Sequence, residues 1–487
     1  MTSPVLAVLW FDTEDFVNPE TDDAPLRIAN LMEKNGVRVV FKIVGEKLRA
    51  LKDHKRTDVL EAMSRHDIGY HSNTHSIHPI ICEYVGDSTW DEGEKEFEEN
   101  ERAGFEEIKG SFGRELSCYG HPGTSWVPQA YPVLKRWNIP VYLDETSTIS
   151  PLNERPFWYG NVLNLMCLGS NVLTLDAGVS LRNLPDDWLD KVPGEFKRIY
   201  EKLRSEDQVG LISVFCHPTT YVTSEWWERK NFLDGKNPPG MKPAKASLKI
   251  KSRSEEDLRN LDSFVKMVKE LPDIHFVAAS DALEIYKDKA DSHHFTIDEL
   301  RTLCEKSVDE VNYLQVSQEI WVSAAEIYGM VLIALNEFRE KGVLPQSLSC
   351  PHPLGPTSFP KANFQIASWD LGTFLDACRK EIDRTIDSGY ISGTINVGAV
   401  NLSPVDFFAT CCWTFVEIAN DRIPRRVEAK QGNFEVAKMV TDEGAKKDWS
   451  YPHYAKGFSA PKQTELARLQ TWTLKPATAD VSKIRWE

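Results

Sequence analysis

The sequence has little that would place the chain in or across a membrane. The longest apolar stretch of its second half, residues 327–335, contains a glycine and is too short to cross a bilayer. We expect no signal peptide, because Met1-Thr2-Ser3-Pro4 leads straight into the first apolar run. We therefore expect no membrane partner and a cytoplasmic location.

Paired cysteines and positive charge are also scarce. The nine cysteines are odd in number and contain no Cys-x-x-Cys pair, which argues against a disulfide framework and favours a reducing compartment. Lysine and arginine number 57 against 73 aspartates and glutamates, giving a net charge of −16. Because nucleic-acid binding needs a basic surface, we expect no nucleic-acid partner.

Length and composition indicate more than one folded unit. A chain of 487 residues exceeds the usual size of a single domain. Hydrophobic residues make up 41% and charged residues 27%, which is typical of globular proteins. We therefore expect two or more domains, each with its own core.

Short apolar runs alternate with helix-like stretches over residues 1–290. Alternation of this kind predicts parallel strands with crossover helices, and about seven or eight such units would close or nearly close a (β/α) barrel. Polar residues that follow the predicted strands should then meet at one edge. They are the acids after Phe11, the histidines after Ile68, Asp144 after Leu143, and His217 after Cys216.

Two of these histidines have the spacing of metal ligands. The stretch Ile68-Gly69-Tyr70-His71-Ser72-Asn73-Thr74-His75 places its imidazoles four residues apart. On a helical turn or a tight loop, this spacing puts both rings on one side, where they can share one ion. A carboxylate is offered by Asp12-Thr13-Glu14-Asp15 at the end of the first predicted strand. Two histidines and one carboxylate leave positions open for water, as hydrolytic sites do.

The order of these motifs along the chain carries a resemblance. The acids follow the first strand, Val39-Val40-Phe41-Lys42-Ile43-Val44-Gly45 forms a second, and Asp67-Ile68-Gly69-Tyr70-His71 precedes His75. Two later stretches, residues 118–123 and 211–218, match more loosely. This order resembles the polysaccharide deacetylase family, also called the NodB-homology group or carbohydrate esterase family 4. The resemblance covers residues 1–290 and implies an α/β fold with a (β/α) barrel, of which a distorted seven-stranded form is one version.

The resemblance also implies roles for individual residues. Asp12 would be the general base, while His71 and His75 would bind a metal together with an acid that follows Asp12. That acid is Glu14 or Asp15, and we favour Glu14 because residues two apart on an extended chain share a face. Zinc is the expected ion, and nitrogen and oxygen ligands also admit cobalt, nickel and manganese.

The remaining catalytic tasks fall on residues from the later motifs. By resemblance, a protonated His217 would deliver a proton to the departing amine, and a backbone N–H near Gly123 would bind the oxyanion. The alternative for His217 is a histidine that caps a backbone group at a strand end. Asp144 is the next supporting acid, either holding His217 or capping a turn.

One departure from the family pattern concerns the arginine that supports the catalytic aspartate. Its position is occupied by Gly120, so His121 or Arg114 would have to replace it. Without a replacement, Asp12 would lose an orienting charge, and sugar deacetylation would be slowed or altered.

Other residues near the motifs have more than one explanation. The aromatic loop at residues 221–232 offers either a surface on which sugars stack or a cover for the rim of the barrel. His66 fits a structural histidine of the family, and His78 lies outside the ligand spacing. Neither histidine is expected in the metal site.

The second half of the chain changes to amphipathic helices, and we predict a helical, repeat-like domain at residues 291–435. A weak repeat at residues 313–328 and 394–408 combines an extended arm, a serine cap and a helix with an acid at its third position. It vaguely resembles the pseudomurein-binding repeat. Residues 436–487 are expected to form an irregular tail. A chain ending near Ala290 is then expected to keep its metal and its activity on small substrates.

Three functions follow from these observations. The first is a metal-dependent hydrolase that removes acetyl groups from an N-acetylated sugar or glycan precursor. The second hydrolyses another linear or cyclic amide C–N bond, and the third is an inactive carbohydrate-binding relative. The expected partner is a carbohydrate or small amide substrate, with a homo-oligomer formed through the C-terminal domain left open.

Overall fold

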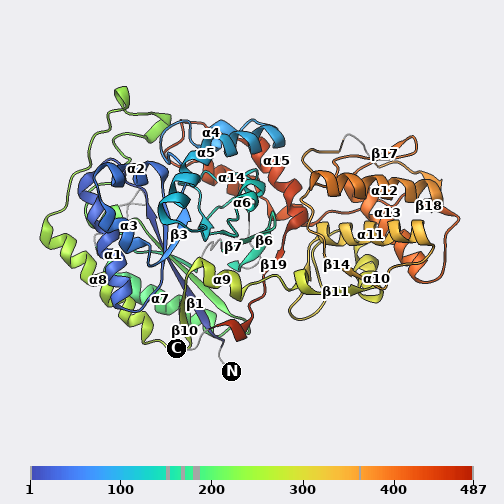
Figure 1. Cartoon of the computed structure of the whole chain (residues 1–487), viewed down its shortest axis with the longest axis horizontal. Coiled ribbons are helices and arrows are strands. Elements are labelled where there is room, and N and C mark those ends of the chain that lie inside the picture. The colour runs from blue at the N-terminus through green and yellow to red at the C-terminus, as the bar shows by residue number, and fades with distance from the viewer. Residues whose placement is uncertain (1–2, 150–153, 166–170, 179–186, 361–363, 485–487) are drawn as a thin grey trace.

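The computed structural model describes the chain except for residues 1–2, 150–153, 166–170, 179–186, 361–363 and 485–487. Figure 1 shows two parts: a sheet with helices around it at the left of the view, and a group of helices at the right. Two large clusters of buried apolar side chains correspond to these parts, one within residues 5–268 with additions from the C-terminus and one within residues 290–472.

The sheet has 11 strands, and its main path runs β19-β6-β7-β5-β4-β3-β2-β1-β9-β8, with β10 paired to β1. Neighbours from β7 through β8 along this path pair in parallel. The strands are β1 (Val5–Thr13), β2 (Val40–Ile43), β3 (Asp67–Tyr70), β4 (Cys118–Tyr119), β5 (Val141–Tyr142), β6 (Phe157–Tyr159), β7 (Val162–Asn164), β8 (Val172–Thr174), β9 (Gly210–Cys216), β10 (Ile274–Val277) and β19 (Lys475–Pro476).

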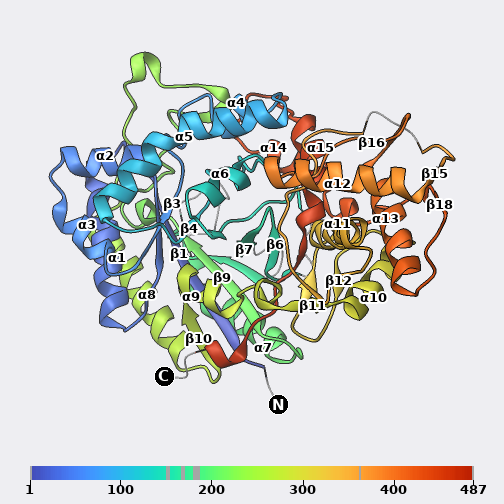
Figure 2. The ribbon, with the colours of Figure 1, turned by 45° about the vertical axis from the view of Figure 1, so that its right-hand side comes forward.

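Helices link these strands and cover the outer face of the sheet, as Figure 2 shows from a second angle. They are α1 (Asp23–Lys34), α2 (Gly45–Asp53), α3 (Thr57–Met63), α4 (Ile81–Val85), α5 (Trp90–Phe112), α6 (Ala130–Arg136), α7 (Trp188–Arg204), α8 (Lys251–Lys269) and α9 (Ala279–Ile285). The mixed α/β character that the sequence predicts is therefore present. The strand count differs from the seven-stranded version, since eight parallel strands lie in one row and the described parts of β7 and β8 do not pair.

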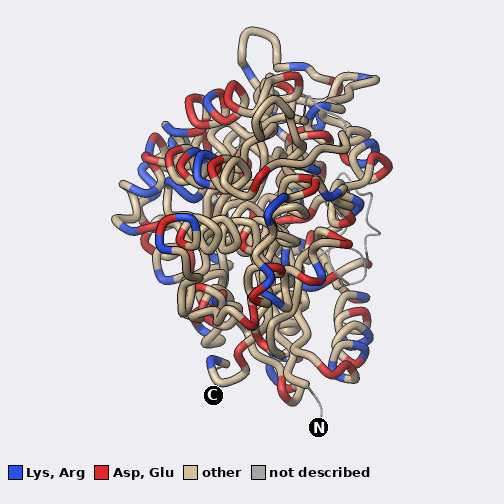
Figure 3. Tube along the Cα trace, turned by 90° about the vertical axis from the view of Figure 1, so that its right-hand side faces the viewer, with Lys and Arg blue, Asp and Glu red and all other residues tan. Residues whose placement is uncertain are grey.

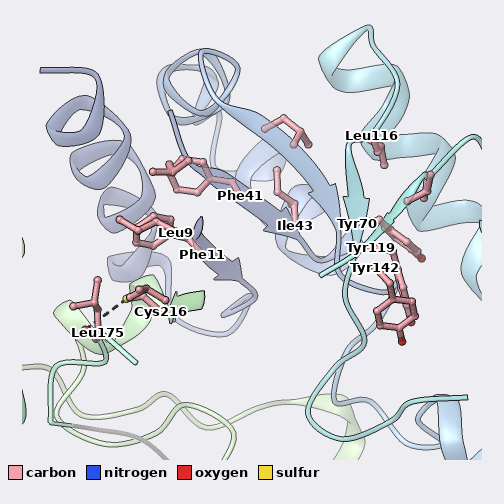
Figure 4. Close-up of a cluster of buried hydrophobic side chains, with 14 of the residues drawn as sticks. Leu9, Phe11, Phe41, Ile43, Tyr70, Leu116, Tyr119, Tyr142, Leu175 and Cys216 are labelled. Carbon is pink, nitrogen blue, oxygen red and sulfur yellow. Dashed lines mark hydrogen bonds between the residues drawn. The ribbon is translucent and has the colours of Figure 1, made fainter. Parts of the chain in front are cut away.

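Strand β1 shows how the sequence positions the site. All nine of its residues are buried, as expected for a strand covered on both faces. Its odd-numbered apolar residues join the cluster under the helices, which Figure 4 shows around Leu9 and Phe11. Leu6, Val8 and Trp10 join the cluster inside the curled sheet. Because side chains alternate between faces, Asp12 continues the inner row at the carboxyl end of the strand.

The helical half is built from α10 (Ile297–Ser307), α11 (Ala324–Lys341), α12 (Leu371–Ser388) and α13 (Pro404–Ala419). Four two-stranded pairs accompany these helices: β11 (His294–Thr296) with β14 (Ser347–Ser349), β12 (Leu314–Gln315) with β13 (Trp321–Val322), β15 (Ser368–Asp370) with β18 (Arg426–Glu428), and β16 (Ile395–Val397) with β17 (Val400–Leu402). The predicted serine caps are present, because Ser323 accepts from Glu326 N and Ser403 from Asp406 N. The resemblance to a pseudomurein-binding repeat stays a prediction.

The C-terminal residues differ from the irregular tail that their composition predicts. They contain α14 (Asp442–Trp449) and α15 (Pro461–Gln470), and β19 pairs with β6 at the edge of the large sheet. Trp472 belongs to the core of the helical half, whereas Ala467 and Leu474 belong to that of the sheet half. Tertiary packing thus orders a segment whose local composition is that of a loop. The division at residues 290 and 435 stays a prediction.

Basic and acidic residues are interspersed along the Cα trace in the view of Figure 3. Among the residues described, none of the helices combines the length and apolar character needed to span a membrane.

Candidate active site

Three predicted metal ligands lie together at the carboxyl ends of β1 and β3. Glu14 follows β1, and His71 and His75 follow β3 in a tight loop where Ser72 and His75 have positive φ angles of 71° and 52°. Glu14 Oε2 lies 2.8 Å from His75 Nε2 and 3.5 Å from His71 Nε2. One ligand atom from each residue lies within 4.8 Å of the other two, and all three side chains are buried.

The second nitrogen of each histidine is held by a neighbour. His71 Nδ1 lies 2.9 Å from the carbonyl oxygen of Gly120, and His75 Nδ1 lies 3.0 Å from Glu228 Oε1. A ring whose Nδ1–H is donated in this way presents the lone pair of Nε2 toward the centre. Both tautomers therefore suit a metal ligand.

The residues present fit a divalent cation. Two imidazole nitrogens and one carboxylate oxygen form the donor set of hydrolytic zinc sites. The ligand atoms face one another among buried side chains, with His75 Nε2 2.8 Å from Glu14 Oε2. Burial opposes a charge on His75, but Glu14 outweighs it and raises the pKa of His75 to about 10. A cation that binds here therefore displaces a proton.

Asp15, the alternative ligand, points away from this centre. Its Oδ1 accepts hydrogen bonds from the backbone N–H groups of Val17 (3.0 Å) and Asn18 (3.1 Å). Thr219 Oγ1 donates to its other oxygen at 2.6 Å. Asp15 therefore fixes the chain after β1, and the geometry favours Glu14 as the carboxylate of the metal site.

Asp12 is paired with a lysine that the sequence analysis missed. Lys42 from β2 is fully buried, and its Nζ lies 3.0 Å from Asp12 Oδ1 and 2.8 Å from Asp144 Oδ2. A Cβ atom at position 120 would lie 2.2 Å from Lys42 Nζ, so glycine leaves the room that this ammonium occupies. The ammonium group of Lys42 therefore places a positive charge next to Asp12.

Neither residue predicted to replace the family arginine does so. His121 Nδ1 lies 3.0 Å from the hydroxyl of Tyr142, and burial lowers the pKa of His121. Arg114 donates to the carbonyl oxygen of His66. The signal for Lys42 was present in the sequence as a single charge within the apolar run Val40-Phe41-Lys42-Ile43.

His217 lies on the other side of Asp12, with its Nε2 3.8 Å from Asp12 Oδ2. Its partner is Asp176, whose Oδ2 lies 3.0 Å from His217 Nδ1. Of the two roles considered for Asp144, holding His217 is not the one observed, because Asp144 pairs with Lys42. Asp144 also accepts from Glu145 N at 2.8 Å, in the turn after β5. Burial opposes a charge on His217, but Asp176 outweighs it and raises the pKa of His217 to about 9.

The aromatic loop contacts the site with buried side chains. Trp227 Nε1 donates to Glu14 Oε1 at 2.8 Å, and the Trp226 ring meets that of His217 edge-on, with centroids 4.8 Å apart. Glu228, which the sequence analysis missed, bridges His75 and His453, and its Oε2 lies 2.9 Å from His453 Nε2. Burial opposes ionisation, but His453 outweighs it and holds the pKa of Glu228 at about 2.

His66 and His78, neither of which is expected in the metal site, make contacts outside it. His66 Nε2 lies 3.0 Å from the carbonyl oxygen of Ala29, and His66 packs on Phe41. His78 Nδ1 lies 2.7 Å from Glu83 Oε2. Neither contributes to the metal centre.

A pocket of about 490 Å³ opens onto these groups. Gly123 lines it, with a φ of +53°, and a Cβ atom there would lie 2.7 Å from the ring of Tyr451. The oxyanion role of its backbone N–H stays a prediction. The pocket is also lined by Lys447, Asp448, Ser450, Tyr451 and Pro452, residues that no motif of the sequence marks.

No family model matches the sequence, and no curated protein matches it. Several solved structures align with it. A putative polysaccharide deacetylase from Mycobacterium smegmatis has 13% identity and a TM-score of 0.38, covering 58% of this chain and 90% of that chain. A CE4 esterase from Streptococcus mutans has 14% identity and a TM-score of 0.33, covering 57% and 87%. A 4-alpha-glucanotransferase from Thermococcus litoralis has 12% identity and a TM-score of 0.40, covering 70% and 47%.

A CE4 family pseudoenzyme from Bacillus anthracis aligns at 12% identity with a TM-score of 0.29, covering 57% of this chain and 65% of that chain. All of these TM-scores are below 0.5, so the likeness carries no argument about this chain. The function proposed for it rests on the geometry of its own site.

Proposed function

We propose that this chain is a metal-dependent hydrolase that removes the acetyl group from the nitrogen of an N-acetylated sugar or glycan precursor. The observation that carries the proposal is the convergence of a three-ligand donor set, Glu14, His71 and His75, with an acid and a histidine that face each other at 3.8 Å. Zinc suits these nitrogen and oxygen donors, as do cobalt, nickel and manganese.

The proposed reaction divides the proton transfers between Asp12 and His217. A bound cation supplies Lewis acidity, which polarises a carbonyl and lowers the pKa of water. Asp12 takes a proton from the attacking water as the oxygen of that water bonds to the acyl carbon. His217 gives its proton to the nitrogen as the C–N bond breaks, so that acetate and a free amine leave. Asp176 keeps His217 protonated, and Lys42 holds the Asp12 carboxylate in place.

The same groups would serve another linear or cyclic amide, which is the second candidate. The small volume of the pocket, about 490 Å³, is the observation that favours it, because such volumes are typical of sites for small molecules. An inactive carbohydrate-binding protein has less support, since both the base and the acid of the proposed reaction are present beside the ligands.

The test is hydrolysis by protein of known metal content. Zinc-loaded enzyme should release equal amounts of acetate and amine from an N-acetylated amino sugar. Asp12→Asn and His217→Ala should retain zinc but lose about 100-fold or more in turnover, since each removes a proton-transfer group. His75→Ala should remain folded and lose the metal. A zinc-loaded wild type that releases neither product from N-acetylated sugars would refute deacetylation, and release from other amides alone would favour the second candidate.

A further inference from the structure

Two segments far apart in the sequence meet above the metal ligands. The first segment is residues 226–235, from the aromatic loop and the turn that follows it. The second is residues 447–454, from the end of α14 onward. Together we call these two segments the rim. Asp234 N donates to the Pro452 carbonyl at 3.0 Å, and Gly235 N donates to the His453 carbonyl at 2.7 Å. The ion pair between Glu228 and His453 adds a third link.

The first segment of the rim follows the strand ends from β9 to β3. Trp226 packs on His217, which follows β9. Trp227 donates to Glu14, which follows β1. Glu228 contacts His75 in the loop after β3. The loop therefore encloses one side of the site with side chains that are themselves buried.

The second segment continues over β4 and β5. The Tyr451 ring lies against Gly123, in the loop after β4. Asp448 Oδ2 accepts hydrogen bonds from Thr146 Oγ1 at 2.6 Å and Ser147 N at 2.9 Å, both in the loop after β5. Thr124 Oγ1 donates to the Asp448 carbonyl at 2.7 Å. These bonds anchor the segment, so the rim is a fixed wall around the strand ends from β9 to β5.

We propose that the rim restricts this site to compact substrates, those with the reacting N-acyl group on a free molecule of one or two rings. An internal unit of a polymer has a neighbour on each side and needs an open passage in both directions. The rim closes the passage from β9 round to β5, so a unit with two neighbours does not reach the metal ligands. The pocket volume of about 490 Å³ lies within the range of small-molecule sites. This inference rests on the proposed deacetylase function and specifies its substrate class.

The test compares N-acetylglucosamine with its linear dimer, tetramer and hexamer on zinc-loaded enzyme. An open groove gains binding energy from each added unit, whereas a rimmed pocket does not. We expect kcat/KM per acetyl group to stay within about threefold from monomer to dimer and to fall for the longer oligomers, whose internal units do not reach the metal ligands. A rise of about tenfold or more with chain length would overturn the inference while leaving deacetylation intact.

Two variants link the result to the rim. Tyr451→Ala removes the ring above Gly123 and should raise kcat/KM for the hexamer relative to the monomer. Tyr451→Phe keeps the ring and should keep the length preference of the wild type. Equal length preferences in all three proteins would overturn the assignment of the rim as the barrier.

A binding measurement separates this inference from the proposed reaction. Titration calorimetry with zinc-loaded Asp12→Asn measures the affinity for each oligomer without turnover. Suppose that the affinity of Asp12→Asn does not increase with oligomer length and that the wild type hydrolyses none of the oligomers. This combination would support the rim as a barrier and refute deacetylation. No binding and no hydrolysis at any length would overturn both.

Discussion

Lys42 is the residue on which the geometry of Asp12 depends. It is fully buried, stacks 3.8 Å above the ring of Trp10 and contacts two carboxylates. Burial opposes its charge, but Asp12 and Asp144 outweigh burial and raise the pKa of Lys42. A buried cation that compensates two buried acids is costly to remove, because the acids then have no partner.

Replacing Lys42 with methionine should therefore lower the free energy of unfolding by about 3–5 kcal/mol. Turnover should fall as well, because Asp12 loses its orienting charge, while zinc content is retained. Chemical denaturation and metal analysis measure the two effects. The double variant Lys42→Met with Asp144→Asn should recover part of the stability, since one uncompensated charge is gone. Lys52→Met, an exposed lysine on α2, is the control; an equally small effect at Lys42 would contradict the proposed role.

The pair His217 and Asp176 predicts the alkaline limb of the pH profile. His217 must carry a proton to act as the acid, and its pKa is raised to about 9, where Asp176 outweighs the effect of burial. kcat/KM should therefore fall as the pH rises through about 9 and His217 loses its proton. Asp176→Asn removes the negative charge and should move this limb toward the ordinary histidine pKa of about 6.5. A limb that stays in place in Asp176→Asn would show that another group is the acid.

At the scale of elements, the aromatic loop after β9 supports a proposed metal ligand, His75, that lies on a different element. Glu228 accepts from Trp226 Nε1 at 2.7 Å and contacts His75 and Ser76. Carboxylates that hold the second nitrogen of a ligating histidine fix its ring and raise its basicity. In the proposed metal site, the loop therefore supports His75 without supplying a ligand itself.

Glu228→Gln should weaken zinc binding by about 10–100-fold, the usual effect of losing such a carboxylate. Competition with a chromophoric chelator measures the dissociation constant directly, and addition of zinc should restore activity. Glu225→Gln, in the same loop but paired with Lys230 outside the site, is the matched control. An unchanged zinc affinity in Glu228→Gln would mean that His75 is oriented by its other contacts.

The elements differ in how far the sequence predicts them. Strand β1 and the acids at its end follow from a continuous apolar run, and the cap at Ser403 follows from the acid three residues later, since both signals are local. The partner of Asp12 does not follow from a local signal, because Lys42 reaches Asp12 from the neighbouring strand. The order of α14 has no local signal either, since it depends on contacts between Asp448 and a loop some 300 residues earlier.

At the scale of the whole molecule, an ionic cluster with a buried centre joins the two halves. Lys475 on β19 contacts Glu326 of the helical half at 2.6 Å and Asp288 at 2.5 Å. His352 lies 2.9 Å from both Glu326 and Asp291. The cluster links the last strand of the sheet to the start of α11. Lys475 and Glu326 at its centre are buried, so loss of either would leave the charge of the other buried and poorly compensated.

This cluster predicts a pH dependence of stability. Burial opposes a charge on His352, but hydrogen bonds to Asp291 and Glu326 outweigh it and raise the pKa of His352 to about 9. A group whose pKa is raised on folding stabilises the fold fully below its unfolded value of 6.5 and loses that contribution as the pH rises through about 9. Chemical denaturation at pH values between 6.5 and about 9 should show a free energy of unfolding that declines with pH, and this decline should be smaller in His352→Gln. Identical slopes in both proteins would contradict the assignment.

The position of the C-terminal segment leads to a prediction opposite to one expectation from the sequence. Because residues 447–454 line or support the site, a chain ending near Ala290 should bind zinc weakly or aggregate, not keep its activity. Zinc analysis and light scattering of a chain ending near Ala290 test this point. His453→Ala in the full chain separates the two causes, because it should remain folded and still bind zinc less tightly. Full zinc occupancy in the shortened chain would contradict the prediction that the site depends on the C-terminal segment.

The return of the C-terminus to β6 has a consequence for synthesis on the ribosome. Domains generally begin to fold from the N-terminal end as the chain emerges. Strand β6 emerges more than 300 residues before its partner β19, so its free edge stays open to pairing with other chains until synthesis is nearly complete. The rim forms equally late, because residues 447–454 are among the last to emerge. The nascent protein should therefore depend on chaperones that shield strand edges, and it should acquire its metal only after release.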